Sequence, residues 1–173
     1  MTRNDAEEFA EFVRATGPRL HRAALLLTGD HHLTEDLTQS TYARVYASWR
    51  RVSRADDPFA YARRTLLNTY FSHRRLRRNS ELPADPHLGS EPATRRSVPA
   101  VDPTTRLDLL DALAALSPHD RAVLVLRYWE DRSVADTAHD LGISETAVRT
   151  RSRRALQRLR PLLDADLTER TSS

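Results

Sequence analysis

Cysteine and lysine are absent from this sequence of 173 residues, and glycine occurs only 4 times. Without cysteine, the chain can form neither a disulfide framework nor a thiolate metal site. The scarcity of glycine and of β-branched runs, beside abundant alanine, leucine, arginine and acidic residues, favours helix. No apolar run approaches the roughly 20 residues that a membrane span requires, and the N-terminus lacks the apolar core of a signal peptide. A cytoplasmic protein is therefore expected.

Because lysine is absent, all 27 strongly basic side chains are arginine, against 24 acidic ones, and the formal net charge is +3. Arginine is the better residue for bidentate contacts to phosphates and base edges. Codon bias in a GC-rich genome, however, replaces lysine throughout a sequence and is the simpler explanation of this composition. The positions of the arginines are therefore more informative than their number.

The N-terminal part of the chain has the pattern of a series of helices. An apolar pattern at helical spacing runs over residues 5–15, and "TGP" at 16–18 is expected to break or kink it. Gly29 stops the apolar stretch that follows. From Leu33 to Trp49, a slowly drifting apolar stripe predicts one further helix.

A helix capped by Asp57 is predicted to begin at Pro58 and to run to Asn79. It mixes aromatic residues with arginines, the combination that single-stranded DNA binding requires, because bases stack on rings beside cations. Cations in a last helical turn also suit the helix macrodipole, which is a purely structural explanation for part of the cluster. The side chains expected to point inward are Phe59, Ala62, Leu66 and Tyr70.

Between Ser80 and Asp102 the sequence becomes rich in proline, serine and acids and loses any lasting period, which is typical of a flexible linker. The predicted fold class is therefore all-α, with two small helical domains. Their expected bounds are 1–79 for an N-terminal helical bundle, 80–105 for the linker, 106–165 for a C-terminal helix-turn-helix domain and 166–173 for a disordered tail.

The second domain opens with leucines at helical spacing and then shows a clear start signal for the next helix. Ser117 is placed as an N-cap and Pro118 as the first helical residue. The helix that follows is predicted to be apolar through Val123, Leu124, Leu126 and Trp129.

The stretch "SVADTAHDLGISETAVRTRSRRALQRLR", residues 133–160, predicts two helices around a tight turn. Gly142 can take the positive φ that such a turn requires, and Ser144 is placed to cap the second helix. Ala138, Gly142 and Val148 have the spacing of a helix-turn-helix, in which a small residue, a glycine and an aliphatic anchor let the two helices approach closely.

The second helix of this pair is predicted to turn a polar and basic face outward. The side chains expected to face a DNA major groove are Glu145, Thr146, Arg149, Thr150 and Arg153, and those placed for phosphates are the helix N-terminus at Ser144 with Arg151, Arg154 and Arg158. The alternative is a basic, solvated helix that merely packs. DNA binding is favoured because turn chemistry, inward stripe and charge agree.

Three stretches resemble one known family. They are "LTGDHHLTEDLTQSTYARVY" at 27–46, "DPFAYARRTLLNTYFSHRR" at 57–75 and "LAALSPHDRAVLVLRYWEDRSVADTAHDLGISETAVRTRSRRA" at 113–155. In this order, separated by a short acidic and proline-rich segment, they are similar to the extracytoplasmic-function sigma factors, the two-domain initiation subunits of bacterial RNA polymerase. The resemblance covers about residues 8–78 and 106–161.

Within "TEDLTQ", Leu33 and Leu37 are expected to hold the helix to the core. The exposed acidic and amide face that remains consists of Glu35, Asp36, Gln39 and Ser40. By itself this face is explained as a solvated helix N-terminus with favourable acids. The resemblance implies instead that it binds the clamp coiled coil of the polymerase β′ subunit, and it implies the β flap as a second contact of the core enzyme.

The resemblance also implies that the loop Val52–Asp57 and the helix after it engage the non-template strand of the downstream promoter element. The residues assigned to this role are Tyr61, Arg64 and Asn68, with Arg74 and Arg75 among the arginines near the helix end. Phe59 and Tyr70 are expected to pack in the core rather than to stack on bases.

The chain departs from the family pattern at three positions. Thr34 and Thr38 stand where the family usually has alanine and valine, and Ser152 stands where an aliphatic residue commonly packs. A serine there buries less apolar surface, at a cost of ~1 kcal/mol. The end of the recognition helix is therefore expected to be looser, unless another side chain fills the space.

The predicted function is that of a sigma factor, with the C-terminal helix-turn-helix on the upstream promoter element and the N-terminal domain on the downstream one. A stand-alone helix-turn-helix regulator is the alternative, and it predicts binding to a duplex operator without polymerase. An enzyme is not expected, because histidines at metal-ligand spacing, a glycine-rich phosphate loop and a Ser/His/Asp arrangement are missing. We accordingly expect no cofactor, no metal and no small-molecule substrate, and the resemblance implies an anti-sigma factor as a further partner.

Overall fold

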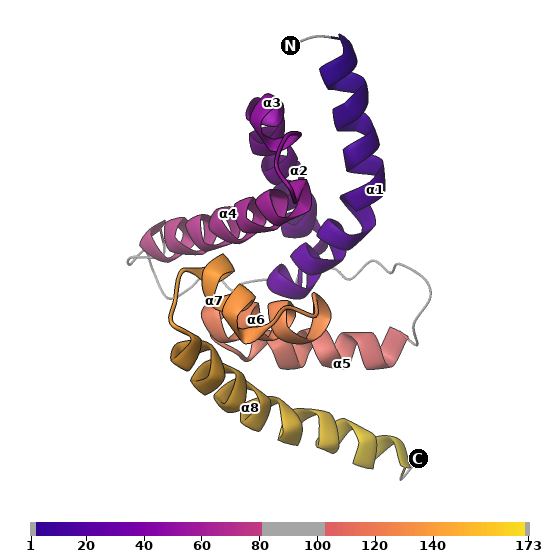
Figure 1. The fold of residues 1–173 in the computed structure, drawn as a ribbon. Coiled ribbons are helices and arrows are strands. Elements are labelled where there is room, and N and C mark those ends of the chain that lie inside the picture. Colours follow the sequence, from indigo (N-terminus) through magenta and orange to yellow (C-terminus); the bar gives the residue numbers. More distant parts are fainter. Residues whose placement is uncertain (1–2, 81–102, 172–173) are drawn as a thin grey trace.

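The computed structural model describes residues 3–80 and 103–171, and all regular structure within these ranges is helical (Figure 1). The predicted all-α class is therefore confirmed. The expected linker falls on residues that, apart from Ser80 and Pro103 to Thr105, lie outside the described ranges.

A first group of helices comprises α1 (Arg3–Thr28), α2 (His31–Ala47), the short α3 (Trp49–Val52) and α4 (Pro58–Ser80). α2 packs between α1 and α4, and α1 also contacts α4 directly. The side chains that this packing buries most completely include Leu20, Leu27, Leu37, Val45 and Leu66. An amphipathic stripe on each helix thus faces a common core.

Of the break or kink expected at residues 16–18, the structure has no break, because α1 continues as one helix through Pro18, and its axis bends in its second half (Figure 1). Proline removes one backbone hydrogen bond, and here packing compensates for the loss. The hydroxyl of Thr16 donates to the Phe12 carbonyl oxygen at 2.7 Å and lies 2.9 Å from the Tyr42 hydroxyl, which ties this turn to α2.

The helix predicted from Leu33 to Trp49 is divided in two. α2 ends at Ala47, and Trp49 starts the separate α3, where its ring is buried against Phe9 and Phe12. The start of α2 lies earlier than predicted, because the Asp30 carboxylate accepts from the Leu33 backbone N–H at 2.8 Å.

The predicted start of α4 is confirmed, since Asp57 accepts from the Ala60 backbone N–H at 2.9 Å and Pro58 is the first helical residue. Of the side chains expected inward, Ala62, Leu66 and Tyr70 are buried and Phe59 is partly buried. A polar side chain, Arg63, is also buried on this helix, which its sequence pattern did not indicate.

A second group comprises α5 (Pro103–Ala114), α6 (Pro118–Leu124), the π-helical turn η1 (Val125–Trp129), α7 (Val134–Leu141) and α8 (Glu145–Thr171). α6 packs on α8, which also contacts α5 and α7. The predicted cap is confirmed, because the Ser117 hydroxyl accepts from the Asp120 backbone N–H at 3.2 Å.

Two sequence expectations for this second group are wrong. Trp129 was predicted to face inward but is exposed, because the π-helical turn changes the register of the side chains after Leu124. The tail predicted from residue 166 is instead helical as far as Thr171, since good helix-forming residues and neither glycine nor another proline follow Pro161 within α8.

The two groups pack against each other, with α1 and α4 contacting α5, α6, η1 and α7 (Figure 1). Most of their buried apolar side chains form one continuous cluster that runs from Leu20 in α1 to Leu159 in α8, and Val123, Ala138 and Val148 form a second, smaller one. Arg121 of α6 enters this contact, and its Nε donates to the Leu26 carbonyl oxygen at the end of α1. Desolvation lowers the pKa of Arg121 to about 10.

Candidate nucleic-acid interface

The predicted helix-turn-helix is formed by α7 and α8. The Ser133 hydroxyl accepts from the Asp136 backbone N–H at 3.0 Å, and the Ser144 hydroxyl accepts from the Ala147 backbone N–H at 3.1 Å. Gly142 has a φ of 65°, which ends α7 in the left-handed conformation that a glycine adopts without strain. Val148 is fully buried and anchors α8 beneath α7.

Directly after this turn, one face of α8 carries exposed polar and basic side chains. Every residue predicted to face a major groove is exposed: Glu145, Thr146, Arg149, Thr150 and Arg153. Within the set, Nη2 of Arg149 lies 2.8 Å from Oε2 of Glu145 in an i,i+4 ion pair, with 61% of the arginine side chain exposed. The arrangement presents one pre-oriented guanidinium at the start of the helix.

Two arginines predicted to contact phosphates are held elsewhere. Nη1 of Arg151 lies 3.0 Å from Oδ1 of Asp120, and Nη2 of Arg154 lies 2.9 Å and 3.0 Å from its two carboxylate oxygens. Although burial by itself raises the pKa of Asp120, hydrogen bonds from Arg154 and Arg151 bring it below the ordinary value. Arg158 is exposed on the same helix.

Ser152 occupies the position where an aliphatic residue was expected. Its side chain is buried, and its hydroxyl oxygen has no hydrogen-bond partner in the described part of the chain. It lines an open groove of about 520 Å³ beside the exposed Tyr128 and Leu156. Whether the end of α8 is looser because of this serine stays a prediction, and the groove beside Ser152 is the feature on which it rests.

On α4, the side chains assigned to the downstream element lie along the outer face. Arg64, Asn68, Arg74 and Arg75 are exposed, and Tyr61 is half-buried. The Arg51 guanidinium lies 3.3 Å from the Tyr61 hydroxyl and 5.7 Å from its ring centre. A hydrogen bond with Ser48 lowers the pKa of this phenol. The helix therefore presents one aromatic ring and several cations to solvent.

A crevice of about 820 Å³ lies beside the second half of α4, at its contact with α6. Its lining includes Asn68, Arg74, Arg75 and Arg77. Two further lining residues, Phe71 and His119, stack their rings with centroids 4.4 Å apart. Burial, and then the nearby Arg151, lowers the pKa of His119 below its ordinary value.

The acidic face predicted on α2 is largely present. Glu35, Asp36 and Gln39 are exposed, whereas Ser40 is half-buried. The two unusual threonines form hydrogen bonds beneath this face, because the Thr34 hydroxyl donates to the Asp30 carbonyl oxygen at 2.6 Å and the Thr38 hydroxyl donates to the Thr34 carbonyl oxygen at 2.7 Å. Thr34 thus satisfies its buried hydroxyl, so the substitution leaves no orphaned polar group.

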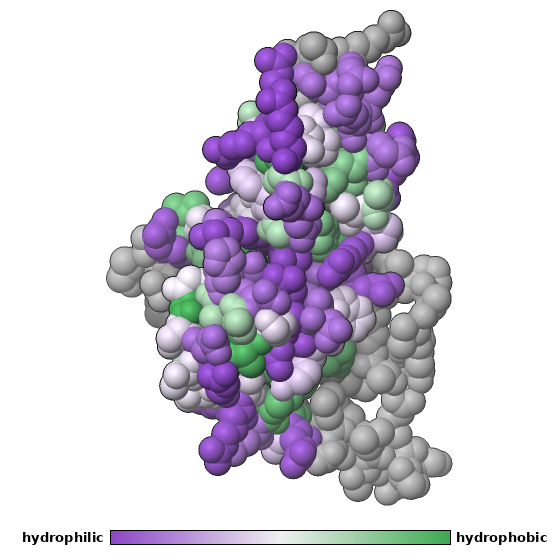
Figure 2. Space-filling model, viewed as in Figure 1, coloured by the Kyte–Doolittle hydropathy of each residue, from purple (hydrophilic) through white to green (hydrophobic). Residues whose placement is uncertain are grey.

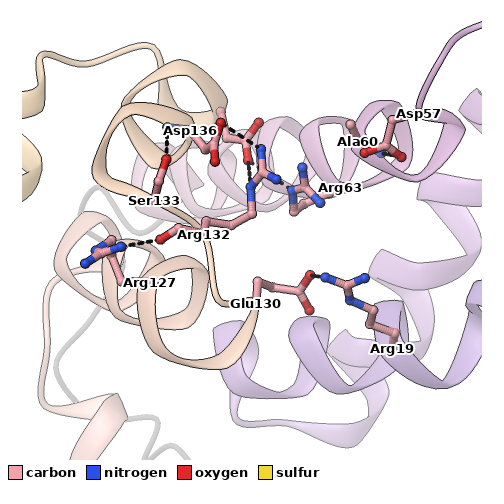
Figure 3. A network of polar contacts seen from close by, with 10 residues as sticks. Arg19, Asp57, Ala60, Arg63, Arg127, Glu130, Arg132, Ser133 and Asp136 are labelled. Carbon is pink, nitrogen blue, oxygen red and sulfur yellow. Dashed lines mark hydrogen bonds and ion pairs between the residues drawn. The ribbon is translucent and has the colours of Figure 1, made fainter.

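A polar network that the sequence did not indicate joins the two helical groups (Figure 3). Arg63 of α4 and Arg132 both reach Oδ2 of Asp140 in α7, at 3.0 Å and 3.3 Å. Nη2 of Arg19 in α1 lies 2.8 Å from Oε2 of the buried Glu130. These acids look like ordinary helix-surface residues in the sequence, since a local pattern does not show a partner on a distant helix.

The surface seen in Figure 2 is mostly hydrophilic, with smaller apolar patches among the charged side chains. In the described ranges, no group of three or more histidine, cysteine or acidic side chains is arranged to hold a metal ion. No helix in the same ranges combines the length and apolarity needed to cross a membrane.

Comparison with known proteins gives two matched families. Residues 12–80 match Sigma-70 region 2, and residues 112–161 match Sigma-70, region 4. The chain is 37% identical over 160 residues to the RNA polymerase sigma-E factor of Streptomyces coelicolor, covering 91% of this chain and 87% of that protein. It is 33% identical over 145 residues to the ECF RNA polymerase sigma factor SigL of Mycobacterium tuberculosis, covering 82% of this chain and 80% of that protein.

Two solved structures are similar along almost the whole chain. The sigma factor RpoE from Bartonella quintana, in complex with the anti-sigma factor NepR, superposes with a TM-score of 0.70 at 25% identity, covering 92% of this chain and 99% of that one. CnrH, in complex with the cytosolic domain of CnrY, gives a TM-score of 0.63 at 25% identity, covering 93% of this chain and 90% of that one.

Proposed function

The chain belongs to the extracytoplasmic-function sigma factors of RNA polymerase, and from this we propose that it binds the core enzyme and selects promoters through two separate DNA contacts. Its action is that of a non-enzymatic initiation factor in the cytoplasm. The observation that carries the proposal is the exposed polar face of α8, which is presented by a complete helix-turn-helix with both caps formed.

The upstream promoter element is read by the first turns of α8 in the major groove. Arg149 is oriented by Glu145 and can reach O6 and N7 of a guanine, while Thr146, Thr150 and Arg153 contact neighbouring base edges or phosphates. The N-terminus of α8, capped by Ser144, favours a phosphate at that point. Arg151 and Arg154 are left out of this set, because Asp120 holds both.

The downstream element is engaged by α4 and the loop before it. Tyr61 offers a ring on which an unstacked base can lie, and Asn68 offers an amide for a base edge. Arg64, Arg74 and Arg75 supply cations for the backbone of the separated strand. Stacking and phosphate contacts together offset the few kcal/mol, roughly, that unpairing a base costs.

Core polymerase is bound through the exposed face of α2. Glu35, Asp36 and Gln39, with Ser40 at its edge, suit a basic or polar helix such as the β′ clamp coiled coil, and the β flap contacts the second helical group. Since the similar RpoE and CnrH structures are complexes with NepR and with the cytosolic domain of CnrY, an inhibitory protein of the anti-sigma class is a further partner.

The two functional units are residues 1–79 and 106–165. In the structure they pack together, and the contact between Arg63 and Asp140 holds α4 beside α7. Since α8 starts soon after Asp140, the two DNA-facing helices lie within on the order of 30 Å of each other. Promoter elements further apart than one helical turn, about 34 Å, can be engaged together only after the units separate.

Run-off transcription with core polymerase tests the proposal. The wild-type chain should direct initiation from a defined start site, and Arg149→Ala should reduce this activity at least about tenfold while affinity for the core enzyme stays the same. Arg14→Ala, on an exposed α1 ion pair, is the control and should initiate normally. Absence of start-site selection by the wild-type chain would refute the proposal, and loss of both activities in Arg149→Ala would indicate misfolding.

A gel-shift experiment separates the alternative function. A stand-alone regulator binds its duplex operator tightly without polymerase, usually as a dimer on a palindromic site. A sigma factor instead needs the core enzyme to form a stable promoter complex, so omission of the core enzyme should abolish the shifted band.

A further inference from the structure

Asp120 lies where α6 meets α8 and is almost completely buried, with 1% of its side chain exposed. Its two carboxylate oxygens bind the guanidinium groups of Arg151 and Arg154, three residues apart on α8, at 2.9 to 3.0 Å. Charge-assisted hydrogen bonds of this length are strong. Together the two contacts fix the position of α8 along its axis and its rotation about that axis. Asp120 is thus bound to the helix that carries the residues predicted to face a major groove. This set, called the reading face below, consists of Glu145, Thr146, Arg149, Thr150 and Arg153.

The position of Asp120 follows from the start of α6. Ser117 caps this helix, Pro118 begins it, and the third helical residue projects its side chain from the first turn. That turn lies against α8, since α6 and α8 are closely packed partners. The Asp120 carboxylate therefore contacts α8 beside the exposed face of that helix.

The two arginines that Asp120 binds are neighbours of the reading face. Arg149 and Arg153 are exposed to solvent. Arg151 is half-buried and Arg154 is exposed, and both are paired with the Asp120 carboxylate. An arginine already paired with a buried acid has part of its charge neutralised and fewer of its five N–H donors free for a phosphate. Its gain from DNA is therefore much smaller than that of an arginine in water.

We propose that Asp120 is a positioning residue for promoter recognition, which orients the reading face of α8 and withholds Arg151 and Arg154 from DNA phosphates. This inference rests on the proposed function. Specificity is the difference between affinity for the promoter and affinity for random DNA, and phosphate contacts raise both affinities alike. Withholding two cations next to the reading face lowers binding to random DNA without removing any base contact.

The consequence is measurable as a salt dependence. Each phosphate neutralised by a cation makes the logarithm of the binding constant fall more steeply with salt, by about 0.9 per contact on duplex DNA. A variant that frees Arg151 and Arg154 should bind random duplex more tightly and with a slope steeper by about one to two units.

The direct experiment compares Asp120→Asn with Asp136→Asn in the full-length chain. Asp136 is a matched control, because it stands at the same place after a capping serine, in α7, and its carboxylate lies 3.5 Å from Arg132 instead of an arginine of α8. Binding to a promoter duplex and to a random duplex is measured, for each variant in complex with core polymerase, over a range of salt concentrations. Asp120→Asn should bind the random duplex about tenfold more tightly and reduce the promoter-to-random ratio by a similar factor, whereas Asp136→Asn should change either by less than about twofold.

A second variant identifies the source of the change. Adding Arg154→Gln to Asp120→Asn should remove most of the gain in random-duplex affinity and about one unit of salt slope. Equal gains in Asp120→Asn and Asp136→Asn would overturn the inference, because net charge alone would then explain them. A parallel loss of both affinities in folded Asp120→Asn, with an unchanged slope, would also overturn it and would show a merely structural role.

If Asp120→Asn does not fold, Arg154→Gln in the wild-type background gives the test. The inference expects random-duplex affinity within about twofold of wild type, and a loss of fivefold or more would overturn it by showing that Arg154 contacts phosphate. The proposed function is judged separately, because it fails only if the wild-type chain does not select a start site with core polymerase.

Discussion

Nε of Arg63 lies 3.0 Å from Oδ2 of Asp140, although 77 residues separate them in the sequence. Only 3% of the arginine side chain and 4% of the aspartate side chain are exposed, and Arg132 lies 3.3 Å from the same oxygen. The pair connects α4, which carries the proposed contacts to the separated strand, with α7, which supports the proposed reading helix. One buried ion pair thus joins the two parts of this sigma factor that are proposed to contact DNA.

Asp140→Asn should weaken this junction strongly. A buried arginine left without its carboxylate costs about 3 to 5 kcal/mol, so the free energy of unfolding measured with urea should fall by that order unless the two units separate. The double variant Arg63→Gln with Asp140→Asn should recover most of the loss, because two neutral amides can hydrogen-bond there. Asp136→Asn, at a half-exposed site on α7, is the control. An Asp140→Asn chain within about 0.5 kcal/mol of wild type would contradict the expectation.

Separation of the two units in the same variant can be followed by fluorescence energy transfer. The sequence contains no cysteine, so two single cysteines at the exposed Leu76 and Leu156 would carry both labels without background. Asp140→Asn should lower the transfer efficiency, and the double variant should restore it. Unchanged transfer in a destabilised chain would show that the loss is confined to packing.

Asp131→Gly should stabilise the protein. Asp131 has a φ of 50°, and every other described residue with a positive φ is a glycine. The left-handed conformation strains an L-residue, so glycine should raise the free energy of unfolding by about 0.5 to 1 kcal/mol. The same substitution inside α7, Asp136→Gly, should instead lower it by about 1 kcal/mol. Thermal unfolding of the two variants would show opposite shifts, and a destabilised Asp131→Gly would contradict the argument.

Ser152→Leu should also raise stability, through a different cause. The serine side chain is buried beside the groove of about 520 Å³, and its hydroxyl has no partner in the described residues. Filling part of this space should add about 1 kcal/mol to the free energy of unfolding. Thr150→Leu, two residues away on the exposed face of the same helix, should add little. A loss of stability in Ser152→Leu would mean that the groove cannot accept the larger side chain.

Stability should depend on pH through His119. Burial and Arg151 lower the pKa of this imidazole in the folded chain, whereas Asp120 opposes the shift. As the pH falls, the unfolded chain therefore takes up the proton first, near its ordinary pKa of about 6.5. The free energy of unfolding should decrease from just above pH 6.5 down to the folded pKa. His119→Gln should lose less stability than wild type over this interval in urea titrations, and an unchanged pH dependence in this variant would contradict the expectation.

The local features of this fold could be predicted because a few neighbouring residues determine them. The caps at Asp57, Ser117, Ser133 and Ser144 depend on a side chain and a backbone N–H within three positions, and the turn at Gly142 depends on one φ angle. The all-α class, the helix-turn-helix and the exposed reading face of α8 follow from these signals together with the apolar periodicity. Pro18 shows their limit, since packing against α2 overrode a strong local signal.

Only the tertiary structure determined which charged side chains are partners. Asp120 with Arg154, Asp140 with Arg63 and Glu130 with Arg19 are pairs from different elements, far apart in the sequence. In the sequence each of these residues is indistinguishable from a solvated charge, because helical periodicity records which face is apolar but not which helix lies opposite. The sequence by itself therefore determined the helices, their caps and the reading surface. Packing between distant helices determined which arginines stay available to DNA and how the two functional units are held together.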